Sequence, residues 1–198
     1  MKQLLITTFL LAFATVTAQH DLPKTAFDVS PLLIGEKIPK VTLTSSEGKT
    51  IDLLSLVRNK KTILVFYRGG WCPYCNVQLS ALSEAENELL LLGYQLVAVS
   101  PDAPKQLQNT TEKEKLKYTL LSDSKGELSK SVGIAFQAPT NYLSIIAKGS
   151  DGANQSFLPV PTVLIVDQDG TIQFEHITPD FKNRISSELL LAAAKALQ

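Results

Sequence analysis

Short apolar runs alternate with helix-like patterns along most of the chain. Three runs rich in β-branched and aromatic residues, at 61–67, 94–100 and 161–167, have the length and composition of buried strands. From 73 to 92 the apolar residues instead recur at spacings of three and four, which predicts a long helix that Gly93 is suited to end. The first buried strand therefore leads directly into the first long helix.

Weaker patterns predict the elements around these runs. Apolar and polar residues alternate from 40 to 53 on both sides of a Ser-Glu-Gly turn, which is typical of a β-hairpin. Residues 134–158 look irregular, and this segment either shapes substrate access or is a surface loop. The other expected elements are an extended lead-in at 19–33, a polar helix at 103–118, a short strand at 119–123, a short helix at 124–132, an antiparallel strand at 171–177 and a C-terminal helix with a serine start at 186–198.

The order of these elements is strand, helix, strand, helix, strand, then hairpin and helix. Such alternation argues for a mostly parallel central sheet covered on both faces. In open α/β sheets, ligands bind at the carboxyl ends of the strands. The only two cysteines, Cys72 and Cys75, lie where the first long strand hands over to the first long helix. The pair therefore occupies a site position.

The N-terminus bears on where the protein works. Lys2 precedes an apolar run, and Val16 and Ala18 stand at its end, as in an export signal at 1–18 that is cleaved after Ala18. An uncleaved N-terminal anchor is the alternative, although threonines interrupt the run. We expect an exported protein, periplasmic or extracellular, without stable membrane insertion after cleavage. Disulfides can persist in such a compartment.

Cleavage leaves 180 residues with 18 basic and 19 acidic side chains, because Lys2 is the only charge lost. That length suits one domain with a sizeable core, which we place at 34–198. A net charge of −1 leaves no electrostatic footprint for nucleic acid or an anionic membrane surface. Neither partner class is expected.

The spacing of the two cysteines suits redox chemistry. With Cys72 at the helix N-cap and Pro73 at the first helical position, Cys75 lies three residues on, on the same face. The unpaired N–H groups and the positive end of the helix dipole favour a thiolate at Cys72. Cys75 lies a turn deeper and should be less exposed. This asymmetry predicts that Cys72 attacks a partner disulfide and that Cys75 resolves the mixed disulfide.

Two other uses of the pair fit the sequence less well. A structural disulfide across a four-residue loop would stabilise by only about 2 kcal/mol, the low end for disulfides. A metal site needs two more ligands, and neither His20 nor His176 has the spacing of a zinc motif. We therefore expect no metal, and we interpret His176 as an ordinary sheet residue.

Residues near the pair are candidates for supporting roles. Trp71 either shields the sulfur and offers a flat apolar surface to a partner chain, or is a core aromatic at a strand end. Arg68 either favours the thiolate electrostatically or is simply solvated. Pro161 opens a buried strand. A cis Val160–Pro161 bond would place backbone polar groups beside the cysteines, and a trans proline at a strand start is the alternative.

W-C-x-x-C between a buried strand and a long helix, with a Pro-Thr strand later, resembles the thioredoxin fold. Pro73-Tyr74 is the dipeptide typical of glutaredoxins. The stretches GEKIPKVTLTSSEGKTIDLLSL, ILVFYRGGWCPYCNVQLSAL, LVAVSPD and LPVPTVLIVDQDG resemble the AhpC/TSA (peroxiredoxin-like) branch of that superfamily, from about Gly35 to Leu191. The resemblance implies a thioredoxin-like α/β fold with a central mixed β-sheet flanked by helices and an N-terminal β-hairpin extension. It also implies a cis Pro161.

Thioredoxins and peroxiredoxins place the reacting cysteine at different positions of this motif. If ILVFY is aligned with the equivalent peroxiredoxin strand, the family's peroxidatic cysteine corresponds to Cys75. The family's Thr or Ser three residues earlier then corresponds to Cys72, and its proline corresponds to Arg68. The arginine that activates the peroxide falls near Val160, and Arg68 and Arg184 are candidates to replace it in space. The thioredoxin pattern instead retains Trp71, Cys72, Cys75 and the Pro161-Thr162 pair.

These observations lead to three functional hypotheses. The first is an exported thiol–disulfide oxidoreductase that cycles a Cys72–Cys75 dithiol/disulfide for redox homeostasis and exchanges electrons with protein thiols or disulfides. The alternative is a thiol-dependent peroxidase that reduces hydroperoxides with an external thiol donor, with Cys75 or Cys72 as peroxidatic cysteine. The third is a non-catalytic binding module. No cofactor beyond the redox-active disulfide is expected, and the candidate supporting residues are Trp71, Pro73, Tyr74, Arg68, Val160, Pro161 and Thr162.

Overall fold

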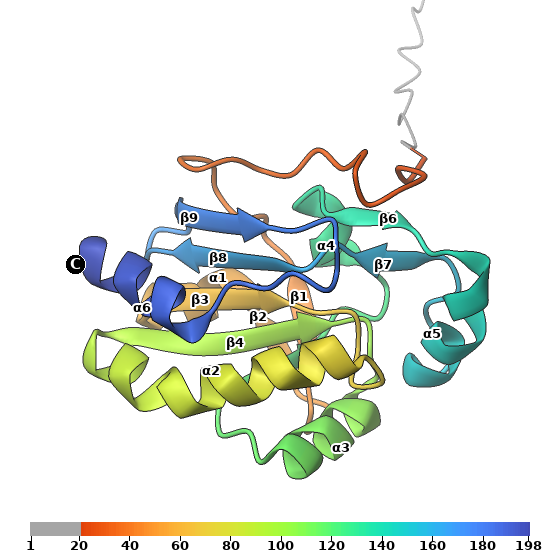
Figure 1. The fold of residues 1–198 in the computed structure, drawn as a ribbon, viewed down its shortest axis with the longest axis horizontal. Helices are drawn as coiled ribbons and strands as arrows, with labels where there is room; N and C mark the ends of the chain where they lie inside the picture. Colours follow the sequence, from red (N-terminus) through yellow and green to blue (C-terminus); the bar gives the residue numbers. More distant parts are fainter. Residues whose placement is uncertain (1–20) are drawn as a thin grey trace, which may run out of the picture.

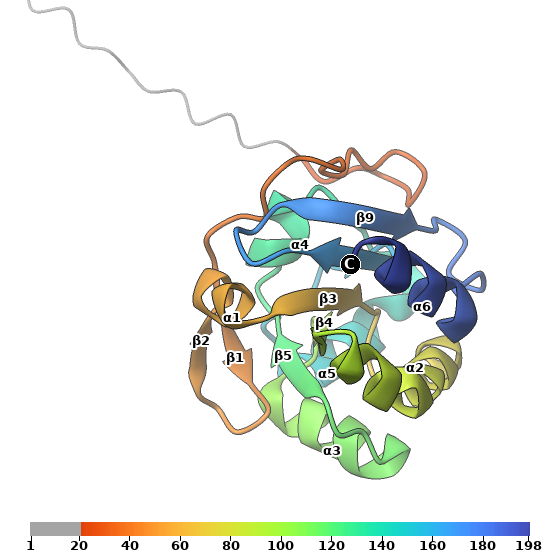
Figure 2. The same ribbon diagram turned by 90° about the vertical axis from the view of Figure 1, so that its left-hand side faces the viewer.

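A seven-stranded sheet with helices on both faces forms the body of the protein (Figures 1 and 2). The structure is a computed structural model that describes residues 21–198, so the predicted signal segment and His20 lie outside the described residues. The strands are β1 (Thr42–Ser45), β2 (Thr50–Asp52), β3 (Lys61–Phe66), β4 (Tyr94–Ser100), β5 (Thr119–Ser122), β6 (Ala135–Gln137), β7 (Phe157–Pro159), β8 (Thr162–Val166) and β9 (Ile172–Ile177). The helices are α1 (Leu53–Asn59), α2 (Pro73–Leu91), α3 (Pro104–Glu114), α4 (Glu127–Ser131), the 3-10 turn η1 (Thr140–Tyr142), α5 (Leu143–Gly149) and α6 (Ser187–Ala196).

The sheet is mixed, as the family resemblance implies. Its strand order is β2-β1-β5-β4-β3-β8-β9. Only β3–β4 and β4–β5 are parallel, while β1–β2, β1–β5, β3–β8 and β8–β9 are antiparallel. The expectation of a mostly parallel sheet, drawn from the alternation of elements, is therefore wrong. The long connection from β5 to β8 is not a single crossover helix, and it returns the chain antiparallel to β3.

Two hydrophobic cores lie on opposite faces of the sheet, because successive side chains of β3 point to opposite sides. Ile63, Val65 and Tyr67 belong to the core beneath α2, α3 and α6, which also contains both cysteines. Leu64 and Phe66 belong to the core beneath α1 and α4. Figure 2 shows α2 and α6 on one side of the sheet and α1 on the other. The central strands are thus buried on both faces, which explains their continuous apolar runs.

The segment 134–158 is more ordered than its sequence indicates. Strands β6 and β7 pair antiparallel, with Ala135 opposite Pro159, and η1 and α5 lie between them. The backbone N–H of Ala103 donates to the carbonyl of Gly149 at 2.8 Å, which ties the end of α5 to the β4–α3 connection. The prediction that this segment is irregular is therefore wrong. Strands of three residues and a helix of seven are too short to leave a periodic pattern in the sequence.

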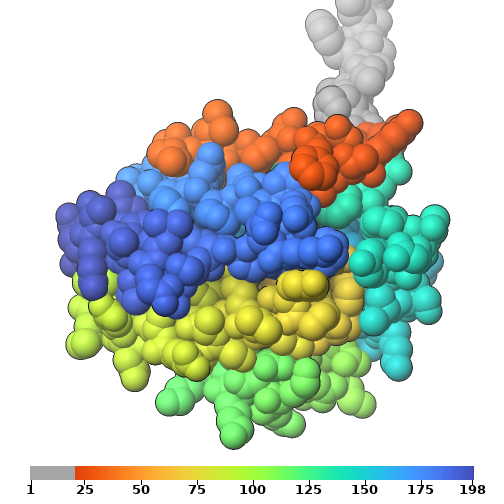
Figure 3. Space-filling model, in the orientation of Figure 1, coloured from red at the N-terminus to blue at the C-terminus, as the bar shows by residue number. Residues whose placement is uncertain are grey.

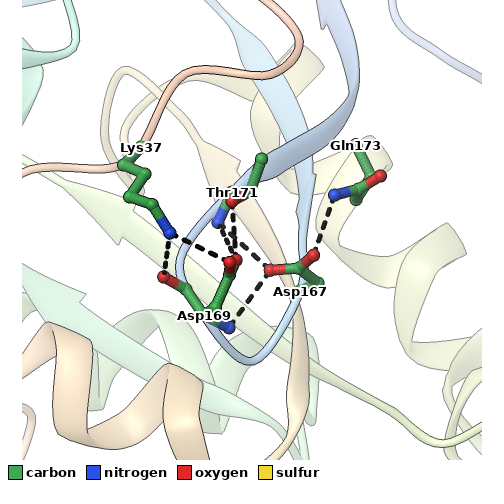
Figure 4. A network of polar contacts seen from close by, with 5 residues as sticks. All are labelled: Lys37, Asp167, Asp169, Thr171 and Gln173. Carbon is green, nitrogen blue, oxygen red and sulfur yellow. Dashed lines mark hydrogen bonds and ion pairs between the residues drawn. The ribbon is translucent and has the colours of Figure 1, made fainter.

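Residues 21–33 form no helix or strand and run over the β9 edge and the β6 region (Figures 1 and 3). Lys37 then anchors the chain to the β8–β9 turn, where its Nζ lies 2.9 Å from Asp169 Oδ2 (Figure 4). Thr171 of the same turn donates to Asp167 and Asp169, and Gln173 of β9 donates to Asp167. Within residues 21–198, no helix combines the length and apolar character that a membrane crossing requires.

Candidate active site

The cysteine pair lies at the junction of β3 and α2, as predicted. Cys72 is the N-cap residue and Pro73 occupies the first turn of the helix. The Cys72 carbonyl accepts hydrogen bonds from the backbone N–H groups of Cys75 and Asn76, both at 3.1 Å. Both thiols are free. Cys75 is fully buried, as its deeper position predicts, but only 1% of Cys72 is exposed, so the expected difference in exposure is small.

The two thiols hold their protons unequally. The pKa of Cys72 is lowered to about 6, first because the Cys75 thiol donates a hydrogen bond to the Cys72 sulfur and then because of the Cys75 backbone N–H and the guanidinium groups of Arg68 and Arg184. Burial and the neighbouring Cys72 sulfur raise the pKa of Cys75 well above its usual value. At neutral pH the negative charge of the pair therefore rests on Cys72, as the N-cap argument predicts.

Arg184 contacts the cysteine pair directly, although the sequence leaves its position open. Its Nη2 lies 3.4 Å from Cys75 Sγ, and its Nη1 lies 3.3 Å from Gln78 Oε1. The Nε atom is buried without a hydrogen-bond partner among the described residues. Arg184 lies between β9 and α6, far in sequence from the strand position where the family resemblance places its arginine. The guanidinium of Arg184 therefore lies directly beside the Cys75 sulfur.

Arg68 is held by aromatic side chains rather than by solvent. It is 4% exposed, and its guanidinium carbon lies 4.1 Å, 4.5 Å and 5.0 Å from the ring centroids of Phe181, Tyr142 and Trp71. Tyr74 in turn meets Phe181 edge to face at 5.6 Å. We call these four rings and Arg68 the aromatic cover. The interpretation of Arg68 as a solvated residue is wrong, since cation–π contacts hold it while its charge lowers the pKa of Cys72.

Asp102 fixes the loop that precedes the cysteines. It is 3% exposed, and its Oδ2 accepts the backbone N–H of Gly70 at 2.7 Å, while the Gly70 carbonyl accepts from Asn76 Nδ2 at 3.0 Å. A Cβ on Gly69, whose φ is +141°, would lie 2.9 Å from Asp102 Oδ1, and a Cβ on Gly149 would lie 2.8 Å from it. The loop and the end of α5 can approach Asp102 only because both positions are glycine.

Neither Asp102 nor the aromatic partners Tyr142 and Phe181 of Arg68 follow from the sequence motif. For Asp102 a usable signal exists, because it lies two residues after the end of the buried strand β4, which pairs in parallel with β3. The carboxyl ends of neighbouring parallel strands meet at one edge of the sheet. Tyr142 and Phe181 lie in connections remote from the motif, and no pattern in the sequence identifies them.

Burial of Asp102 predicts a measurable effect on stability. Desolvation raises its pKa from 3.8 to about 6, against the hydrogen bond from Gly70. The folded state therefore binds a proton more tightly than the unfolded state, so this carboxyl favours folding below pH 4 and loses that contribution as the pH rises through 6. The free energy of unfolding of wild type, relative to Asp102→Asn, should fall by up to about 3 kcal/mol between pH 4 and pH 7.

Urea unfolding at several pH values measures this difference. Asp151→Asn, at an exposed aspartate close to the end of α5, is the matched control and should track wild type at every pH. Parallel curves for wild type and Asp102→Asn would show that the buried carboxyl has an ordinary pKa.

The Val160–Thr162 segment does not serve the cysteines as expected. No cis peptide bond occurs in residues 21–198, so Val160–Pro161 is trans and the cis bond implied by the resemblance is wrong. The Val160 N–H donates to Ile134 at 2.8 Å, and its carbonyl accepts from the Thr162 hydroxyl at 3.0 Å. The Val160 side chain belongs to the core on the face opposite the cysteines. The backbone N–H and carbonyl of Val160 therefore form hydrogen bonds within the chain. His176 is an ordinary residue of β9, as predicted.

Comparisons with known proteins agree with this architecture. Peroxiredoxin Bcp of Escherichia coli is 30% identical over 164 residues, which cover 82% of this chain and 96% of that protein. A putative peroxiredoxin bcp of Haemophilus influenzae is 36% identical over 106 residues, covering 54% of this chain and 68% of that protein. Among solved structures, reduced Prx3 from Vibrio vulnificus in complex with H2O2 superposes with a TM-score of 0.71 at 18% identity, covering 83% of this chain and 96% of that one. The model of the AhpC/TSA family matches residues 34–175, and the chain belongs to the AhpC/TSA family.

Proposed function

We propose that the protein is a thiol-dependent peroxidase that reduces a hydroperoxide at Cys75 and forms a Cys72–Cys75 disulfide. The contact of Arg184 Nη2 with Cys75 Sγ, at 3.4 Å, carries this proposal. A guanidinium beside the sulfur can donate hydrogen bonds to a peroxide and stabilise the charge that develops on the departing oxygen. The relatives named peroxiredoxin favour this reaction over disulfide exchange, which is the first functional hypothesis from the sequence.

The two neighbouring thiols can exchange the protons that this reaction moves. As the Cys75 sulfur attacks the terminal oxygen of ROOH, its proton moves to the Cys72 thiolate, the O–O bond breaks and RO⁻ leaves. The alkoxide takes the proton from Cys72 and departs as ROH. Cys72, again a thiolate, attacks the sulfenic sulfur of Cys75 and releases hydroxide, which leaves as water after protonation. The low pKa of Cys72 thus suits it both as base and as resolving nucleophile.

A groove gives the peroxide a route to Arg184. It lies between α2 and residues 182–188 and has a volume of about 670 Å³. Arg184 and Gln78 form part of its wall, and Val77, Leu82 and Ile185 contribute an apolar part. A hydroperoxide entering here would meet the guanidinium before the buried sulfur.

Disulfide exchange remains the second candidate, because the Cys72 thiolate at a helix N-cap is the form that attacks disulfides. The two functions share the Cys72–Cys75 disulfide and differ in what oxidises the dithiol.

One pair of assays separates them. Wild type lacking residues 1–18 should consume hydrogen peroxide and cumene hydroperoxide over many turnovers with dithiothreitol as reductant, and the double variant Cys72→Ser/Cys75→Ser should not. Reduction of insulin disulfides is measured in parallel. If wild type reduces insulin but leaves both peroxides untouched, the peroxidase proposal fails and disulfide exchange stands.

A further inference from the structure

A second pocket, of about 280 Å³, opens beside the loop that precedes Cys72. It shares no residue with the groove at Arg184. Its walls come from α3, from α5 and from the loop residues Gly70 and Trp71. Trp71 directly precedes Cys72 in the chain, so the loop that carries the redox site forms part of the pocket wall. Its volume lies just below the usual range for ligand pockets, about 300–1,000 Å³, so it suits a small molecule rather than a protein partner.

The lining of this pocket carries charges of both signs. Asp102, itself 97% buried, is the one acidic residue of the lining within residues 21–198, and one of its oxygens accepts the Gly70 N–H. Lys113 and Lys148 are exposed lysines of the lining. Lys113 Nζ lies 3.0 Å from Glu114, and the lysine side chain is 66% exposed, so its ammonium group can also reach a ligand carboxylate. The arrangement matches a ligand that carries an ammonium group and a carboxylate.

We propose that this pocket binds a small thiol bearing both an ammonium and a carboxylate group, such as an amino-acid or short-peptide thiol, and that this thiol reduces the Cys72–Cys75 disulfide. Asp102 would accept the ammonium group, and Lys113 and Lys148 would pair with the carboxylate. Trp71 would contact the aliphatic part. The inference rests on the proposed function, because every turnover of a peroxidase leaves a disulfide that an external donor must reduce.

The reduction balances with two molecules of the thiol. The first thiolate, RS⁻, attacks the Cys72 sulfur, breaks the Cys72–Cys75 bond and releases Cys75, which takes a proton. The second RS⁻ attacks the ligand sulfur of the mixed disulfide and releases RSSR and the Cys72 thiolate. A thiolate with a low pKa is a good leaving group, which favours this second step.

Binding can be measured without turnover, because Trp71 is the only tryptophan of the chain and lines the pocket. S-methylcysteine and S-methylglutathione, which cannot react, should change its fluorescence with saturation, whereas the uncharged 2-(methylthio)ethanol should not. Lys113→Ala and Lys148→Ala should each weaken binding roughly 2- to 5-fold, as expected for exposed ion pairs. Lys105→Ala, an exposed lysine of α3 outside the pocket, is the matched control and should not change it.

Steady-state kinetics then test the role in turnover. In Lys113→Ala and Lys148→Ala, the KM for L-cysteine or glutathione as donor should rise relative to the KM for dithiothreitol. Of these two charged donors, the one with the lower KM in wild type is the better match to the pocket. The inference is overturned if neither S-methyl probe changes the Trp71 fluorescence with saturation. It is also overturned if the lysine variants leave the ratio of the KM for the charged donor to the KM for dithiothreitol unchanged. If no donor supports peroxide turnover in wild type, the proposed function fails instead, while probe binding still reports on the pocket.

Discussion

Cys75→Ser is expected to lower hydroperoxide turnover by roughly 10³-fold or more, the scale on which loss of a catalytic nucleophile acts. Cys72→Ser is expected to retain a slower activity, reduced by about 10²-fold, because it loses the base that accepts the Cys75 proton. In that variant the Cys75 sulfenic acid has no neighbouring thiol, and dithiothreitol must reduce it directly. Peroxide consumption with dithiothreitol measures both rates.

Mass spectrometry after one equivalent of peroxide gives an independent readout. Wild type should form the Cys72–Cys75 disulfide, and Cys72→Ser should accumulate sulfenic acid at Cys75 and then sulfinic acid with excess peroxide. The wild-type rate should also fall as the pH drops below about 6, where Cys72 becomes protonated. If Cys75→Ser turns over peroxide and Cys72→Ser does not, the roles are reversed and the Cys72 thiolate attacks the peroxide itself.

The position of the cysteine pair is predictable because its determinants are local. A buried strand, an N-cap residue, Pro73 and the apolar spacing of the helix all lie within 61–92, and the structure reproduces β3, α2 and the N-cap there. The hairpin of β1 and β2 and the antiparallel β9 are confirmed for the same reason, since turn residues and alternation occur side by side in the sequence.

The chemistry around the pair depends on contacts between remote segments. The guanidinium of Arg184 reaches Cys75 across 109 residues, and Tyr142 and Phe181 reach Arg68 from two separate connections. Such contacts leave no periodic signal. The direction of β8 is equally non-local, because it depends on how the segment 134–158 folds back, and the short elements of that segment carry no readable pattern. The sequence therefore locates the sulfurs but does not identify what activates them.

Arg184→Gln is expected to lower kcat/KM for hydroperoxide by about 10²- to 10³-fold, the range for removing one donor that stabilises developing negative charge. The side chain is half-buried at the groove, and glutamine keeps a polar group there, so the fold should persist. Arg184→Lys should fall between wild type and Arg184→Gln, because lysine keeps the charge but cannot present several donors in a plane.

The contacts of Arg184 permit a graded test of the same idea. Gln78→Leu removes the oxygen that accepts from Arg184 Nη1 at 3.3 Å, and it should lower kcat/KM by a smaller factor, since Arg184 keeps its charge but loses a fixed orientation. Arg58→Gln, at an exposed arginine in the last turn of α1, is the matched control and should leave the rate unchanged. Stopped-flow measurement of peroxide-driven oxidation, followed by Trp71 fluorescence, isolates this step from reduction by the donor. A rate within twofold of wild type for Arg184→Gln would exclude Arg184 as the group that activates the peroxide. Arg68, the other guanidinium that lowers the pKa of Cys72, would then be the remaining candidate within the described residues.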